Sequence, residues 1–226
     1  MMKICAAAAA AVAVVMTVPL AGQAGRKPAA PASPAAPARA ERRVPFAVGE
    51  KLLYDVSWSS YVTAGTLSLT VESKKPSYGS TAYYVVAEAQ TTGVVASLYT
   101  LYYKADTLID SYSLLPQRGS LFSGEGRRQR FKVTTFDHPR KYGKFEMQTA
   151  SKMEKDLTLR PLTQDMLSAF YVLRSISPRP GDKLEIPVSD SGWNYAVTFV
   201  VTGPESAKTA AGTAAPALRV TPQVID

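Results

Sequence analysis

The sequence predicts a mainly β protein, with a curved antiparallel sheet or partly open β-barrel and one packed α-helix. Two observations favour this fold class. Apolar and polar residues alternate along many segments joined by short turns, as in an antiparallel meander. One later segment instead has apolar residues at helical spacing. We therefore expect a single helix to lie across the concave face or the mouth of the sheet.

The expected strands follow one another along most of the chain. Alternation predicts a first pair of strands at residues 52–58 and 67–71, with Ala64 and Gly65 in the turn between them. Each later strand is bounded by turn residues. These strands are expected at residues 81–88, 98–109, 111–121, 127–136, 142–149, 155–159, 183–188, 195–202 and 218–225.

The expected helix lies between the strands at residues 155–159 and 183–188. Thr163 is expected to cap it, and Asp165 falls in its first turn, where a negative charge is favourable. Pro178 ends the helical pattern. The apolar face is expected to consist of Met166, Phe170, Leu173 and Ile176, with Leu167, Ala169 and Tyr171 beside it.

Residues 1–24 have the order of a secretory signal peptide: a positive start, an apolar run at residues 4–20, and small residues Gly22 and Ala24 before the cleavage point. Gln23 stands where a lipidated protein would have its cysteine, so no lipid attachment is expected. An uncleaved anchor is the alternative, but a spanning helix needs about 20 strongly apolar residues, and this run is shorter and rich in alanine. We expect a periplasmic or secreted protein with no transmembrane anchor in the mature chain.

Residues 25–44 are rich in proline and alanine, which predicts a disordered linker, and residues 45–226 are expected to form a single β-rich domain. Cys5, the only cysteine, lies in the leader, so disulfides are not expected. The formal charge of +8 becomes +7 once Lys3 is removed. A basic exported protein is expected to meet anionic membranes or cell-wall polymers rather than nucleic acid. Solubility is the plainer explanation of the charge.

The sequence contains no pattern that indicates catalysis, a cofactor or a metal. His138 is the only histidine and precedes a proline, which favours a role in a turn or in packing. Gly124 and Gly126 flank Glu125 in an expected turn that lacks the ending of a phosphate loop. The acidic residues are scattered, although two of them could still meet in a groove, as a hydrolase of cell-wall sugars requires. We expect a non-catalytic protein and keep the hydrolase as the less favoured alternative.

Several stretches resemble an uncharacterised envelope family, the domain of unknown function 3108. They are VPFAVGEKLLYDVSW at 44–58 followed by Ala64-Gly65, residues 110–111 with 114–116, residues 125–127 and 136–138, and DMLSAFYVLR at 165–174 with 180–182. The resemblance covers nearly all of the chain after the linker. It implies a secreted, mainly β protein with no established activity. Family members usually continue past the strand at 217–225 into another strand pair. The sequence is therefore either truncated at Asp226, or the protein lacks these strands and exposes an edge strand there.

The curled sheet and helix implied by the resemblance are similar in architecture to periplasmic carriers that shelter lipoprotein acyl chains. A helix laid over such a sheet often leaves an apolar cleft. Trp58, Phe170 and Tyr171 are the candidate aromatic residues of this cleft, with packing in the core as the alternative. The expected ligand is a lipid or another apolar or amphiphilic envelope component.

The segment that begins at Arg128 offers a second candidate surface. Alternation places Arg128, Arg130 and Lys132 on one face of a strand, with Phe131 and Val133 on the other. We expect the apolar side to enter the core and the basic side to face outward, where it could bind an anionic membrane. A solvated strand face is the alternative. The alternative function is a structural or assembly partner of an envelope protein, acting through this basic face and an exposed edge strand.

Overall fold

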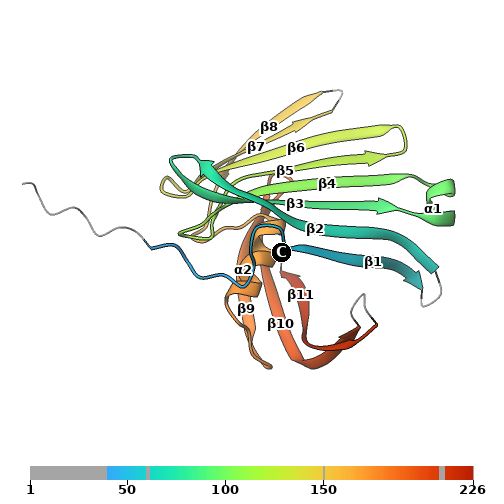
Figure 1. Cartoon of the computed structure of the whole chain (residues 1–226). Coiled ribbons are helices and arrows are strands. Elements are labelled where there is room, and N and C mark those ends of the chain that lie inside the picture. The colour runs from blue at the N-terminus through green and yellow to red at the C-terminus, as the bar shows by residue number, and fades with distance from the viewer. Residues whose placement is uncertain (1–39, 60–61, 150, 209–211, 226) are drawn as a thin grey trace, which may run out of the picture. The chain divides into compact units, whose positions relative to one another are not determined.

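Antiparallel strands form two separate sheets in the computed structural model, which describes residues 40–59, 62–149, 151–208 and 212–225. The expected signal peptide and most of the expected linker lie outside these residues. Within them, the mainly β fold class with an unclosed sheet is confirmed. Figure 1 shows the strands and the two helices.

The larger sheet has eight strands that pair in chain order, each antiparallel to the next. The first and the eighth strand form its two edges. The strands are β1 (Lys51–Ser59), β2 (Val62–Ser77), β3 (Ser80–Thr91), β4 (Leu101–Asp110), β5 (Pro116–Glu125), β6 (Arg128–Asp137), β7 (Tyr142–Gln148) and β8 (Lys152–Thr158).

The smaller sheet has three strands, β9 (Lys183–Asp190), β10 (Trp193–Lys208) and β11 (Ala214–Ile225), in the order β11-β10-β9. The turn between β9 and β10 contains Ser191, whose φ of 51° is left-handed. β11 is an edge strand, and its Leu218 and Val224 are exposed.

The turn expected at Ala64 and Gly65 was wrong, because both residues lie inside β2. Gly65 pairs with Val56 of β1 and with Thr91 of β3, beside an irregularity in the β1–β2 register. A Cβ at Gly65 would stand 2.4 Å from the carbonyl oxygen of Gln90. This glycine therefore marks a close approach of two strands and not a turn.

Two helices occur in the described residues, the short α1 (Gly93–Leu98) and α2 (Met166–Ser175). α1 was not expected. Asp165, and not Thr163, caps α2: its carboxylate accepts hydrogen bonds from the backbone N–H groups of Leu167 and Ser168. The Thr163 hydroxyl instead donates to the carbonyl of Arg160. Neither helix is long and apolar enough to cross a membrane.

The apolar face expected for α2 was only partly right, because the helix packs against both sheets. Tyr171 joins a cluster with Phe46, which precedes β1, and with Ile109 of β4 in the larger sheet. Ala169 and Leu173 join another with residues of β9 and β10, including Val188. Met166 is the first residue of α2 and Ile176 follows its last residue, and both are exposed at these ends of the helix.

Candidate binding site

A cavity of about 650 Å³ lies between α2 and one face of the larger sheet, which we call the inner face. Its volume falls within the range of about 300–1,000 Å³ that is usual for small-molecule sites. Most of the lining side chains are apolar or small. The lining consists of Tyr54, Leu67, Leu69, Ala87, Ala105, Asp106, Gly119, Ser120, Leu121, Lys132, Thr134, Phe145, Asp165, Met166, Leu167, Phe170, Ser189, Asp190 and Ser191.

One row of inner-face residues crosses the sheet from apolar to charged. Strand register pairs Leu69 with Ala87, Ala87 with Ala105, and Ala105 with Leu121. Leu121 in turn pairs with Lys132. The row spans four inter-strand spacings, or about 19 Å. Within the cavity lining it is an apolar track that ends at Lys132, and beyond the lining the row continues to Met147 of β7.

Small residues at the centre of the sheet make the space for this cavity. Ala87 and Ala105 are the middle members of the row, and Gly119 lines the cavity from the neighbouring strand β5. A larger side chain at any of these positions would fill part of the cavity, since strand side chains stand roughly perpendicular to the sheet. Small residues on the same face of three consecutive strands are therefore a sequence signal for this cavity. None of the three was among the expected site residues.

Asp165 closes one side of the cavity and ties α2 to the inner face. One carboxylate oxygen accepts from the backbone of Leu167 and Ser168, and the other accepts from the Thr107 hydroxyl at 2.5 Å. Burial raises the pKa of Asp165, while these hydrogen bonds oppose the rise. A Cβ at Gly119 would lie 3.1 Å from the carboxylate, so the glycine leaves room for it.

The polar end of the cavity joins β6 to the turn between β9 and β10. The Lys132 ammonium donates to the Ser191 hydroxyl at 2.7 Å, and Ser191 donates to the Asp190 carboxylate at 2.9 Å. Ser189 also lines the cavity and is 2% exposed. Its hydroxyl has no hydrogen-bond partner among the described residues. This turn was not expected to form part of the site.

The three basic candidates of β6 separate in the structure. Lys132 lines the cavity, whereas Arg128 and Arg130 are absent from the lining, and Arg128 is exposed. The expectation that the basic side of this strand faces outward was therefore wrong for Lys132, because its face of the sheet is the one that α2 and the β9–β10 turn cover. Phe131, on the opposite face, is half-buried.

The aromatic candidates also separate. Phe170 lines the cavity. Tyr171 is 1% exposed and packs edge-on against Phe46, so it belongs to the core. Burial and the nearby Glu50 carboxylate raise the pKa of Tyr171 to about 12. Trp58 belongs to β1, and its side chain lies outside the described set.

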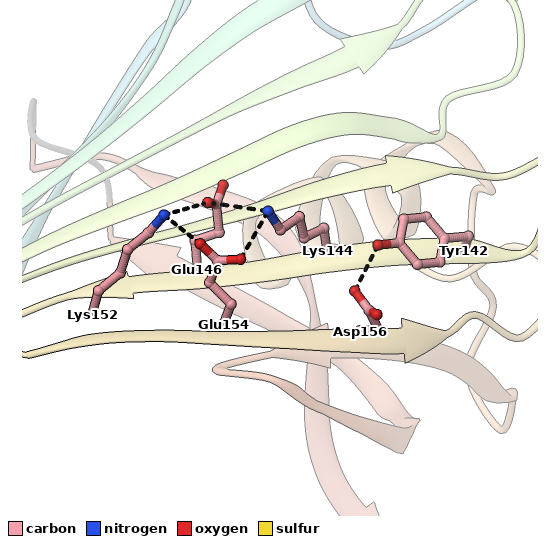
Figure 2. Close-up of polar contacts among 6 residues, drawn as sticks. All are labelled: Tyr142, Lys144, Glu146, Lys152, Glu154 and Asp156. Carbon is pink, nitrogen blue, oxygen red and sulfur yellow. Dashed lines mark hydrogen bonds and ion pairs between the residues drawn. The ribbon is translucent and has the colours of Figure 1, made fainter.

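The opposite, outer face of the larger sheet carries paired charges at the β7–β8 edge. The ammonium of Lys144 lies 3.0 Å from Glu154 and 3.5 Å from Glu146. Lys152 is paired with the same two carboxylates (Figure 2). The Tyr142 hydroxyl donates to Asp156 at 2.6 Å beside them. Such charges protect an edge strand from pairing with other chains.

His138 lies away from the cavity lining. Its ring stacks on Phe136, with 5.8 Å between ring centroids, and its Nε2 is 2.8 Å from the carbonyl oxygen of Pro116. Burial lowers the pKa of His138. These contacts are those of a packing residue, as expected. No cluster of three or more residues suited to holding a metal ion occurs in the part of the chain that the structure describes.

Comparisons with known proteins leave the site without a described counterpart. No curated protein matches the chain, and no solved structure matches it. The sequence pattern of one family matches residues 53–226, a stretch that includes almost all of both sheets and every residue that lines the cavity. The chain therefore belongs to the family described as protein of unknown function DUF3108.

Proposed function

We propose that this protein binds, and in the cell envelope carries, an apolar or amphiphilic molecule such as a lipid, and that it does so without catalysis. The observation that carries the proposal is the cavity of about 650 Å³ with its apolar inner-face row. Burial of an acyl chain contributes about 0.8 kcal/mol per methylene, so a cavity of this kind can supply substantial affinity. The leader expected at residues 1–24 would place this activity outside the cytoplasm.

The partners of two carboxylates, Asp165 and Asp106, support a binding role over hydrolysis. Asp165 accepts three hydrogen bonds that cap α2 and fix it to β4. Asp106 follows the inner-face Ala105, so its carboxylate lies on the outer face, where it pairs with Arg118 at 3.0 Å and accepts from Ser120. A pair of catalytic carboxylates must be free to exchange protons with the substrate. Both of these groups have structural partners instead.

A purified, folded chain tests the proposal directly. The protein is produced with its own leader, purified from the periplasm, weighed by native mass spectrometry and then extracted with organic solvent. We expect an additional mass that extracts as a lipid. Binding is then measured with N-phenylnaphthylamine, a neutral apolar dye whose fluorescence rises in apolar sites.

A matched pair of variants tests whether the dye binds in the cavity. Ala105→Trp fills the centre of the cavity and is expected to weaken dye binding by more than about 10-fold, which corresponds to about 1.4 kcal/mol. Ser68→Trp adds the same side chain on the outer face, because Ser68 lies between the cavity-lining Leu67 and Leu69. It should bind the dye like the unmodified chain. An apo mass together with no dye binding would refute the proposal and favour an assembly partner that acts through its edge strands.

A further inference from the structure

We propose that the amphiphile carries an acidic head group, and that Lys132 and Ser189 hold this head at the polar end of the cavity. The inference rests on the proposed function, since it names the chemistry of the molecule that the cavity takes. Its starting point is the row of inner-face residues that runs from Leu69 through the two alanines to Lys132. An acyl chain along this row would bring its head to the ammonium.

Hydrogen-bond donors are in excess at this end of the cavity. A lysine ammonium has three N–H donors, and within the described residues Lys132 donates only to the Ser191 hydroxyl and forms no ion pair. The Ser189 hydroxyl is buried and unpartnered. A buried polar group without a partner is costly, so it favours a ligand that completes its hydrogen bonds.

The acceptors of the lining are more fully occupied than its donors. The Asp165 carboxylate accepts three hydrogen bonds, and the carboxylate of Asp106 lies on the outer face, where it accepts from Arg118 and Ser120. The Asp190 carboxylate accepts one hydrogen bond, from the Ser191 hydroxyl of the β9–β10 turn. Besides the second oxygen of Asp190, the groups that remain open at this end are an ammonium and a hydroxyl, and both can donate. A head with anionic oxygens, either a carboxylate or a phosphate, satisfies both.

Three ligands with one acyl chain test the head group. Hexadecanoate carries a carboxylate, hexadecanoyl lysophosphatidate carries a phosphate, and hexadecanoyl monoglyceride is neutral. Each is titrated against N-phenylnaphthylamine bound to the purified full-length mature chain after delipidation. We expect at least one of the acidic ligands to displace the dye at concentrations about 10-fold lower than the monoglyceride, as one charged hydrogen bond would give.

Substitutions then assign the effect to the two residues. Lys132→Met keeps the length of the side chain and is expected to weaken binding of the acidic ligand by about 10- to 100-fold, while monoglyceride binding stays within about 2-fold. Ser189→Ala should weaken the acidic ligand by about 3- to 10-fold. Arg128→Met is the control, because it removes one positive charge from the exposed start of the same strand. It should change neither affinity.

The possible results distinguish recognition of the head group from binding of the acyl chain in the cavity. Preference for hexadecanoate identifies a carboxylate, and preference for lysophosphatidate identifies a phosphate; both support the inference when Lys132→Met removes the preference. Equal binding of all three ligands, or an equal loss for all three in Lys132→Met, would overturn the inference while the cavity still binds. Failure of every ligand and of the dye to bind would instead overturn the proposed function itself.

Discussion

Lys132 and Lys144 occupy neighbouring strands of one sheet but lie on opposite faces, and their surroundings differ accordingly. The outer Lys144 has two carboxylates within 3.5 Å, and the hydrogen bond to Glu154 raises its pKa (Figure 2). The inner Lys132 contacts the Ser191 hydroxyl, a neutral group. The outer cation is compensated by its neighbours, whereas the inner cation is left available to a ligand. For these two lysines, the face of the sheet on which the side chain lies decides whether neighbouring carboxylates compensate its charge.

The largest effect on stability is expected from substitutions at two adjacent residues of β7, one on each face of the sheet. Phe145 is 1% exposed on the inner face, and Glu146 is in the outer charge cluster. Phe145→Ala is expected to lower the free energy of unfolding by about 3–5 kcal/mol, because it leaves a cavity in the cluster with Phe136 and Leu157. Glu146→Ala should cost far less, because exposed ion pairs contribute little.

Urea denaturation followed by circular dichroism measures both losses. If the two variants lost similar amounts of stability, the distinction between a packed inner face and a solvated outer face would not hold. Native mass spectrometry of the Glu146→Ala variant provides a control for association through the less charged β8 edge.

A second test uses two glycines of β5. Gly119 faces the Asp165 carboxylate, which would lie 3.1 Å from a new Cβ, whereas the nearest atom to a Cβ at Gly124 would be 3.6 Å away. Gly119→Ala is therefore expected to lower the free energy of unfolding by about 1–3 kcal/mol through crowding. Gly124→Ala should be neutral or raise it by up to about 1 kcal/mol, since alanine restricts the unfolded chain. Thermal unfolding compares them, and an equally tolerated Gly119→Ala would show that Asp165 can move.

The alternation of residues was enough to predict most of the sheet but not which face is inner. For β6 the expected strand at 127–136 agrees closely with Arg128–Asp137. Its two faces both carry long side chains, however, and nothing local tells Lys132 from Phe131 as the inward residue. The answer depends on α2 and on the β9–β10 turn, which are distant in sequence. Ser189 escaped notice for the same reason, because a serine in a strand carries no sign of what covers it.

The pH dependence of stability tests Asp165 on the inner side. Burial raises the pKa of Asp165 above that of the unfolded chain, so between the two pKa values the native state binds the proton more strongly. The free energy of unfolding therefore falls as pH rises through this window and recovers as pH falls through it. Asp165→Asn keeps a capping residue but cannot titrate.

The measurement is urea denaturation of both chains at several pH values from about 7 down to about 4. We expect the unmodified chain to gain stability relative to Asp165→Asn as pH falls. Groups such as Asp110, whose pKa is lowered by its hydrogen bonds to Ser80 and Ser113 despite burial, are common to both chains and cancel in the difference. A relative loss on acidification would mean that the hydrogen bonds outweigh burial at Asp165.

The smallest effect on stability is expected from substitutions of the two lysines, Lys132 and Lys144. Lys132→Met removes a partly buried charge that has only a neutral partner, so we expect the variant to be at least as stable as the unmodified chain. Lys144→Met leaves Glu146 and Glu154 without one of their cations and should lose some stability, less at high salt, where exposed charges are screened. Urea midpoints at low and high salt compare them. Residues kept for binding often cost stability, so a gain at Lys132 alongside weaker binding would mark it as a functional residue. A greater loss at Lys132 than at Lys144 would instead mean that its bond to Ser191 holds the β9–β10 turn in place.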